Sequence, residues 1–561
     1  MQVYARCMRV KPRVTSSLAS WGLLAMPIFA AGLVLHYRHA AGGGYPLDDS
    51  WIHLAFARHL AQGVGFGVNA GQWSTGSTSP LWALLLAGGL LFGVGHQIWP
   101  WLLGMSVLAG TGWAASIVVR RLLATRGETE GPAATTAPIL GGLLAVTSSG
   151  LVWSAAGAME TPLFTMFLLL AWSERLREDL PGSRGGRSLP SWGVFAGLAA
   201  LARPEGLLFA TLLALSSRSL RSGLGNLVLT LAVYAPYGIY CYALTGTIWP
   251  STLLAKTTRA VAGLPDPGYA LKSFGLIARL MPVLVVLLGA GLLLWGAASL
   301  FTHSARNTEQ RAAEARTGRW ARWRPRLPGM LFPIALPLAY ASMGRTYLFA
   351  GLAGNFGRYF FPLAPFLAIV GLDAAMRGTA RWRGRVRPAW VLLAVAGLTG
   401  WNAGRAYDQA SFFAHNVRDV NAMQVEMARR LARDLPPGSR VAANDVGALA
   451  YFTDLRVLDL VGIVSPEVQQ ALFPLRRSDR RTRHEALFRL LTKLRPAAIV
   501  VFPQWYREIL QSLEPVRQPL EEIRVPGNIT AAQDVLVAYR LNWLAAAPGP
   551  GAAGPPPHGR P

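Results

Sequence analysis

The sequence predicts a polytopic α-helical membrane protein that carries a soluble α/β domain near its C-terminal end. Of the 561 residues, 52% are hydrophobic and 15% are charged, whereas about 25% are charged in ordinary globular domains. Apolar runs of about twenty residues, the length that a bilayer-spanning helix needs, alternate with arginine clusters, and this pattern stops after Trp401. These observations argue against a cytosolic enzyme.

The chain is strongly basic, but its charge is scattered. The 54 Lys and Arg residues exceed the 28 Asp and Glu residues, for a net charge of +26, yet they fall in short clusters that form no continuous face for nucleic acid. Cys7 and Cys241 lie far apart, which excludes a disulfide framework and a cysteine metal cluster. We therefore expect membrane lipid around this chain, and no nucleic acid partner.

The first apolar run covers about residues 18–36 and follows a basic N-terminal segment. It exceeds the core of about 7 to 15 residues that a secretory signal peptide has. We therefore expect an uncleaved anchor whose N-terminus lies in the cytoplasm.

Five later arginine clusters predict the topology. Because Lys and Arg are retained on the cytoplasmic side, the chain must leave and return between consecutive clusters. A shorter run at about 80–94 fits a re-entrant or juxtamembrane helix and is not counted as a crossing. The chain returns once between the first run and the cluster at Arg120, and a last run at about 389–403 carries it outward, for about eleven crossings in total. The paired runs lie at about 137–155 with 161–174, 191–202 with 204–217, 225–243 with 276–300, and 327–343 with 356–375.

This parity divides the chain into three parts. We expect a transmembrane module at 1–403, an extracytoplasmic α/β domain at 404–542, and a disordered tail at 543–561, which is rich in Pro, Gly and Ala. In the α/β domain, hydrophobic periodicity predicts an amphipathic helix at 412–435 and strands at 440–443 and 497–502.

Asp48 and Asp49 stand just beyond the first membrane helix, in the segment that continues to His53. Two adjacent carboxylates at an apolar boundary are costly to desolvate, and ionisable groups of this kind in membrane proteins are candidate functional residues. The alternative is a solvated loop that caps a helix at about 51–62.

Three further charged residues lie in extracytoplasmic turns between apolar spans. Glu160 begins a helix, where an acid also complements the helix dipole. Arg203 and Glu205 occupy a tight hairpin, where an ion pair within the loop is the simpler explanation.

Two cations on the same side could bind phosphate. Lys256 is one of few lysines in a chain whose basic residues are mostly arginine, and Arg358 opens a membrane helix. Both have a structural alternative, since long basic side chains snorkel to lipid headgroups. What favours a site is that these cations and the carboxylates converge on one face, in a topology obtained without them.

Motifs for soluble nucleotide substrates are missing from the sequence. It contains no Walker motif and no Asp-x-Asp, and its glycine-rich segment at 63–67 lacks the third glycine of a dinucleotide fingerprint. A site for ATP or for a nucleotide sugar is therefore unsupported.

The chain resembles the membrane glycosyltransferases of the GT-C fold, and within them the subgroup that includes cell-wall arabinofuranosyltransferases. The matching segments extend over most of the chain: LDDSWI at 47–52, ARHLAQGVGF at 57–66, GSTSPLW at 76–82, METPLF at 159–164, ARPEG at 202–206, WPST at 249–252 with Lys256, RY at 358–359, NDVGA at 444–448 and DLVG at 459–462.

The resemblance implies an inverting enzyme of a bacterial-type plasma membrane that works on the extracytoplasmic face. It would move a sugar from a polyprenyl phosphate donor to a glycan, lipid or protein acceptor. By analogy Asp48 is the general base, Asp49 and Glu160 orient substrate or a divalent cation, and His53 and Glu205 position substrate. The roles implied for Lys256, Arg358 and Arg203 are to neutralise the departing lipid phosphate.

Two other classes of function remain open. A lipid-linked sugar transporter or flippase would also place charges within a membrane protein, although we find no repeated halves of the kind that such folds show. The third reading is an inactive membrane scaffold whose soluble domain binds glycans, which the acids at 48, 49 and 160 argue against.

Overall fold

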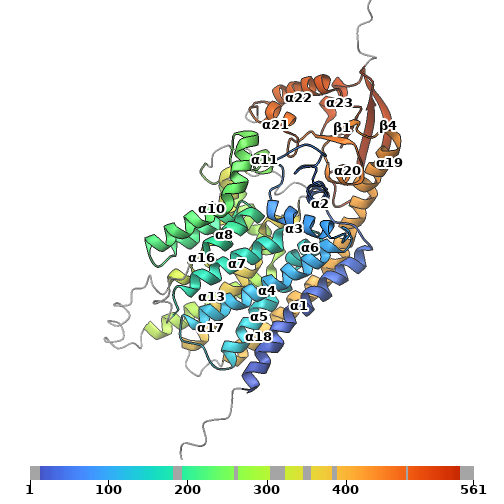
Figure 1. The fold of residues 1–561 in the computed structure, drawn as a ribbon. Helices are drawn as coiled ribbons and strands as arrows, with labels where there is room; N and C mark the ends of the chain where they lie inside the picture. The colour runs from blue at the N-terminus through green and yellow to red at the C-terminus, as the bar shows by residue number, and fades with distance from the viewer. Residues whose placement is uncertain are drawn as a thin grey trace, which may run out of the picture.

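The structure is a computed structural model that describes residues 13–180, 192–257, 263–303, 323–344, 355–381, 388–475 and 478–543. A large helical part is followed by a smaller part built on a β-sheet, which sits on one end of the helices (Figure 1). The first and last stretches, and with them Cys7 and most of the tail expected at 543–561, lie outside the described residues.

The helical part runs from α1 to α18. Its α-helices are α1 (Arg13–Ala41), α2 (Asp48–Ala61), α3 (Pro80–Leu91), α4 (Trp99–Ala124), α5 (Pro132–Val146), α6 (Ser149–Ala156), α7 (Thr161–Arg177), α8 (Trp192–Ala202), α9 (Gly206–Leu215), α10 (Leu220–Thr245), α11 (Ser251–Ala255), α12 (Pro267–Leu280), α13 (Pro282–His303), α16 (Leu327–Met343), α17 (Ala364–Arg381) and α18 (Pro388–Val420). Two 3₁₀ segments, η1 (Arg324–Arg326) and η2 (Asn355–Leu363), precede α16 and α17.

Apolar helices indicate an integral membrane protein. By length and composition, four helical stretches among the described residues are fit to cross a bilayer: Trp99–Ala124, Leu220–Thr245, Pro282–Ser299 and Gly357–Thr379. Three shorter apolar helices, α3, α8 and α9, accompany them.

The single span expected at about 137–155 is broken in the structure. Helices α5 and α6 meet at an angle of 55°. If the two helices together are treated as one bent span, they make a fifth candidate membrane crossing. The chain then turns through Ala158, whose φ of 55° is left-handed, and α7 begins immediately after Glu160. The bend and this turn set the position of Glu160.

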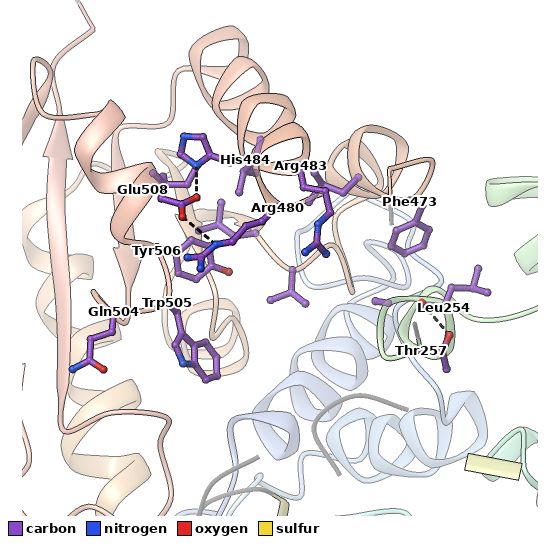
Figure 2. A pocket seen from close by; sticks show the side chains of 16 residues that line it. Leu254, Thr257, Phe473, Arg480, Arg483, His484, Gln504, Trp505, Tyr506 and Glu508 are labelled. Carbon is purple, nitrogen blue, oxygen red and sulfur yellow. Dashed lines mark hydrogen bonds and ion pairs between the residues drawn. The ribbon is translucent and has the colours of Figure 1, made fainter. Parts of the chain in front are cut away.

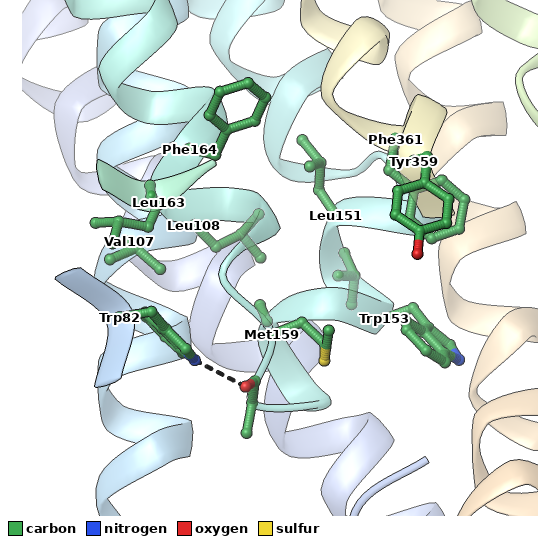
Figure 3. Close-up of a cluster of buried hydrophobic side chains, with 14 of the residues drawn as sticks. Trp82, Val107, Leu108, Leu151, Trp153, Met159, Leu163, Phe164, Tyr359 and Phe361 are labelled. Atoms are coloured by element: carbon green, nitrogen blue, oxygen red, sulfur yellow. Dashed lines mark hydrogen bonds between the residues drawn. The ribbon is translucent and has the colours of Figure 1, made fainter. Parts of the chain in front are cut away.

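A buried cluster beneath this turn holds it in place (Figure 3). Trp82 of α3 is fully buried and donates a hydrogen bond from Nε1 to the carbonyl oxygen of Ala158, at 2.8 Å. Trp153 of α6 donates in the same way to Asn416 of α18, at 3.1 Å. Because a buried indole N–H needs an acceptor, these bonds fix the turn against helices that are distant in the sequence.

Helix α2 begins earlier than the sequence suggested. The alternative interpretation placed Asp48 and Asp49 in a solvated loop that caps a helix at 51–62, but the structure places both residues in the first turn of α2. Acidic residues are favourable there because they complement the positive end of the helix dipole. The two carboxylates therefore belong to a rigid element, and consecutive side chains on it point in different directions.

The helix expected at 412–435 is not separate from the last apolar run. Helix α18 continues through residue 403, and after a π-helical turn, Asn421–Val425, it passes into α19 (Glu426–Asp434). The boundary that we expected at 403 thus falls inside one continuous 33-residue helix.

The C-terminal part contains a five-stranded sheet in the order β2-β1-β3-β5-β4. Strand β1 pairs in parallel with β2 and β3, whereas β5 is antiparallel to β3 and β4. The predicted strands at 440–443 and 497–502 are present as β1 and β3. The elements are β1 (Arg440–Ala443), α20 (Gly447–Phe452), β2 (Arg456–Asp459), α21 (Pro466–Leu472), α22 (Arg480–Leu494), β3 (Ala498–Val501), α23 (Arg507–Ser512), β4 (Arg517–Arg524) and β5 (Val535–Leu541).

Side chains of the segment after α1 hydrogen-bond to the backbone of the sheet part. Arg58 donates to the carbonyl oxygens of Tyr451 and Ala450, at 2.6 and 2.9 Å. Asn69 both donates to and accepts from the backbone of Val457 in β2, at 2.9 and 2.7 Å. These contacts dock the sheet part directly over the predicted site.

Candidate functional site

A small cavity of about 50 Å³ lies where the helical part meets the sheet part. Its walls come from the start of α2, the turns before α7 and α9, helix α11, segment η2 and the loop after β2. The polar and charged residues among its lining are Asp49, His53, Ser77, Thr78, Glu160, Arg203, Glu205, Thr252, Lys256, Arg358 and Tyr359. Three acidic and three basic side chains therefore face one space, which makes it nearly neutral when His53 is uncharged.

Asp49 is held by two cations in this cavity. Its Oδ2 accepts a hydrogen bond from Nη2 of Arg358 at 2.5 Å and lies 3.7 Å from Nζ of Lys256. Burial disfavours the charged carboxylate, but the positive charges of Lys256 and Arg358 outweigh it and hold the pKa of Asp49 below its usual range. Asp49 is therefore ionised at neutral pH.

Arg358 has hydrogen-bonding capacity to spare. Its side chain is only 5% exposed, and its Nη1 is buried with no hydrogen-bond partner among the described residues. A buried guanidinium N–H without an acceptor is unfavourable, so this N–H is available to donate a hydrogen bond to a further anionic oxygen.

A second network surrounds Glu160. Arg203 donates from Nη1 to Glu160 at 2.8 Å and from Nη2 to Glu205 at 3.0 Å, and Tyr340 donates to the same oxygen of Glu205 at 2.7 Å. Nε2 of His53 lies 3.3 Å from the other oxygen of Glu160. Burial alone would raise the pKa of Glu160, but His53 and Arg203 lower it below its usual range. This network pairs Arg203 with two acids.

Asp48 points away from the cavity. Its two carboxylate oxygens accept hydrogen bonds from the backbone N–H groups of Gly447 and Ala448, at 2.6 and 2.8 Å, in the first turn of α20. A Cβ on Gly447 would lie 2.1 Å from the carbonyl oxygen of Asp48, so only glycine permits this approach. Burial and the neighbouring Asp445 raise the pKa of Asp48, against the effect of the two N–H donors.

The three acids that we considered as metal ligands do not meet. Asp48 binds backbone N–H groups, Asp49 binds two cations, and Glu160 binds His53 and Arg203. Across the described ranges, no group of three or more His, Cys, Asp or Glu side chains is arranged to hold a metal ion. The donor set therefore does not fit the divalent cation that the sequence left open.

Seven of the eight predicted site residues line one cavity, namely Asp49, His53, Glu160, Arg203, Glu205, Lys256 and Arg358. The exception is Asp48. Sequence reasoning missed Tyr340, which lies inside an apolar run, and Ile463, which the sheet part supplies to the cavity wall. Neither residue carries a local signal, because only the tertiary contact makes it part of the site.

Comparisons with known proteins bear on the fold. A family described as a domain of unknown function (DUF8728) matches residues 415–545, and no curated protein matches the sequence. The crystal structure of ArnT from Cupriavidus metallidurans, bound to undecaprenyl phosphate, superposes with a TM-score of 0.52 at 15% identity, covering 91% of this chain and 97% of ArnT.

Two further solved structures are similar at lower scores. An oligosaccharyltransferase from Archaeoglobus fulgidus, in complex with Zn and sulfate, has a TM-score of 0.48 at 12% identity and covers 93% of this chain and 73% of its own. The arabinofuranosyltransferase AftD from Mycobacteria has a TM-score of 0.43 at 15% identity and covers 92% of this chain and 41% of its own. The likeness to ArnT shows that the chain has the GT-C fold, as the sequence resemblance predicted.

Proposed function

We propose that this chain is a membrane glycosyltransferase that transfers a sugar from a polyprenyl phosphate donor to an extracytoplasmic glycan, lipid or protein acceptor. The observation that carries the proposal is the Asp49 cluster: a carboxylate neutralised by Lys256 and Arg358, two cations that line the same cavity. The shared fold with ArnT, which was crystallised with undecaprenyl phosphate, supports a donor of that class.

The donor phosphate would compete with Asp49 for its two cations. Lys and Arg form strong charge-assisted hydrogen bonds to phosphate oxygens, and the cavity has no excess positive charge to attract an anion otherwise. When Lys256 and Arg358 turn to the phosphate, the Asp49 carboxylate loses the charges that lower its pKa. Donor binding would therefore make Asp49 a stronger base.

We accordingly assign the general base to Asp49 and not to Asp48. Asp49 accepts the proton of the acceptor hydroxyl while the hydroxyl oxygen forms a bond to the anomeric carbon of the donor sugar. The bond from that carbon to the phosphate oxygen breaks, and its electron pair leaves on the polyprenyl phosphate, where Lys256 and Arg358 stabilise the growing charge. In-line attack of this kind inverts the anomeric configuration.

The network around Glu160 has a positioning role in this proposal. Because Glu160 and Glu205 already neutralise Arg203, we assign Arg203 to holding these acids and not to the donor phosphate. His53, held by Glu160 at 3.3 Å, and Glu205 then present polar atoms to the hydroxyl groups of the sugars.

The topology belongs to the same proposal. We place the cavity on the extracytoplasmic face of a bacterial-type plasma membrane, with about eleven crossings and the soluble α/β domain outside, because the arginine clusters keep the opposite loops in the cytoplasm. Cysteine labelling of intact cells with an impermeant reagent tests this arrangement. Labelling of position 454 but not of position 120 is expected, and the reverse pattern contradicts it.

The transfer itself is tested with the full-length protein in nanodiscs and a synthetic short-chain polyprenyl phosphate sugar. We expect release of polyprenyl phosphate together with a new glycoside when an acceptor glycan is present. In sealed proteoliposomes, movement of the donor across the membrane without cleavage would instead support a flippase, and binding without either event would support a scaffold.

A further inference from the structure

A second, larger cleft of about 630 Å³ lies beside the catalytic cavity. One wall is α11 of the helical part, and the other walls are α21, α22 and the loop after β3 (Figure 2). The mechanism proposed above leaves this cleft without a role.

The two spaces share their dividing wall. In α11, Leu254 and Ala255 face the cleft, whereas Thr252 and the following Lys256 face the cavity of Asp49. In the loop after β2, Val461 faces the cleft and Ile463 faces the cavity. An elongated ligand bound in the cleft is therefore separated from the cavity of Asp49, the proposed base, only by the short helix α11.

An aromatic surface is available in the cleft. The side chain of Trp505 is 49% exposed although large apolar side chains are usually buried. Figure 2 shows Trp505 and Phe473 on opposite sides of the open space. A flat indole face of this kind packs against the apolar C–H face of a sugar ring while the ring hydroxyls stay in contact with water.

The charged residues of the cleft leave one arginine available. Arg480 pairs with Glu508 at 3.1 Å, and His484 lies 3.8 Å from the same carboxylate. The guanidinium group of Arg483, on the same helix, has no ion-pair or hydrogen-bond partner in the part of the chain that the structure describes. This group extends into the open space (Figure 2), where its fork of donors suits a carboxylate or a phosphate.

We propose that this cleft is the acceptor subsite and that the acceptor is an acidic glycan, bearing uronate or phosphate groups. Trp505 stacks on one sugar ring and Arg483 pairs with the acidic group, so that the next part of the glycan reaches over α11 toward Asp49. The assignment as acceptor subsite rests on the proposed glycosyltransferase function, whereas the binding of acidic glycan does not.

Direct binding tests the subsite without any donor. The full-length protein in nanodiscs is titrated calorimetrically with a short oligogalacturonate, with mannose 6-phosphate, and with neutral maltotetraose. At least one acidic probe should bind about ten-fold more tightly than the neutral one, as expected for a charge-assisted pair. The probe that is preferred identifies the acidic group as carboxylate or phosphate.

Variants locate the binding in the cleft. Arg483→Ala should remove the ten-fold preference for the acidic probe, and Arg483→Lys should retain part of it. Trp505→Ala should weaken the binding of every sugar probe, acidic and neutral alike. Arg481→Ala is the matched control, because Arg481 lies on the same helix, is 89% exposed and does not line the cleft.

The proposal is overturned if acidic and neutral probes bind equally, or if Arg483→Ala and Trp505→Ala both bind like the unaltered protein. Steady-state kinetics then test whether the bound glycan is the acceptor of the transfer reaction. Arg483→Ala should raise the KM for the acceptor about ten-fold and leave the KM for the donor unchanged. Binding that depends on Arg483 in a protein that transfers no sugar would refute the glycosyltransferase and leave the acidic-glycan site standing.

Discussion

The interface around Asp48 and the cavity around Asp49 start at neighbouring residues of α2, yet each holds its carboxyl group in a different way. Asp48 is bound by two backbone N–H groups of α20, which cannot move without separating the sheet part from the helices. Asp49 is bound by the side chains of Lys256 and Arg358, which can turn to another anion. An immobile partner suits a structural contact, and a replaceable partner suits a binding site.

The largest effect is expected at Asp49. Asp49→Asn removes the proposed base, and general-base catalysis contributes about 10²- to 10⁴-fold to a rate, so kcat/KM for sugar transfer should fall by a factor in that range. The variant should still fold and insert into the membrane, because Asn keeps an oxygen that accepts the hydrogen bond of Arg358. Asp454→Asn, at an exposed position of the sheet part, is the control, and an active Asp49→Asn protein would refute the assignment.

Removal of either cation should have the next largest effect. A charge-assisted hydrogen bond contributes about 1.5 to 3 kcal/mol, so Lys256→Ala and Arg358→Ala should each slow transfer by about 10- to 100-fold. The loss should appear in kcat and not merely in the KM for the donor, since the phosphate gains charge in the transition state. Two variants with unchanged kinetics would indicate that these side chains neutralise Asp49 and do not assist the reaction.

The pH dependence of kcat/KM tests whether Asp49, and not Asp48, is the base. Lys256 lowers the pKa of Asp49, and the acid limb of kcat/KM reports the base in the free enzyme. As the pH falls, Lys256→Ala should therefore lose activity at a higher pH than the unaltered protein. If the acid limb of the kcat/KM profile of Lys256→Ala stays at the same pH or moves to lower pH, Asp49 is not the titrating base.

Asp48→Asn should act on stability and not on the reaction. An amide accepts the N–H groups of Gly447 and Ala448 less well than a carboxylate does, and it can present its own N–H₂ to one of them. We expect a loss of about 1 to 3 kcal/mol, seen as a lower melting temperature and faster proteolysis between the two parts. If Asp48→Asn were as stable as the unaltered protein but inactive, the roles assigned to the two acids would have to be exchanged.

The smallest effect is expected at Tyr340, which bonds to Glu205 from a helix that is otherwise apolar. Tyr340→Phe removes that hydrogen bond, worth about 1 kcal/mol, and should slow transfer by about five-fold. Tyr242→Phe offers a control, since Tyr242 is a 62% exposed tyrosine on α10. Equal rates in the two variants would show that the Glu205 network does not assist the reaction.

The sequence by itself determined the class of molecule and most of the charged residues that line the cavity. Long apolar runs are stable only in a bilayer or in a protein core. Charged residues among them cost desolvation free energy and are therefore mostly functional. This is why Asp49, Glu160, Arg203, Lys256 and Arg358 could be selected from composition and order alone. The strands β1 and β3 could also be predicted from the sequence, because short apolar runs between turns favour buried strands.

Only the tertiary structure decided what each group does. Asp48 and Asp49 are equivalent in the sequence, and the close approach of Gly447 makes one a structural contact and leaves the other in the cavity. The partners of Asp49 lie about 200 and 300 positions away along the chain, and Tyr340 gave no local signal. A pattern along the chain records which residues are polar, whereas the role of a charge depends on the partner that folding brings to it.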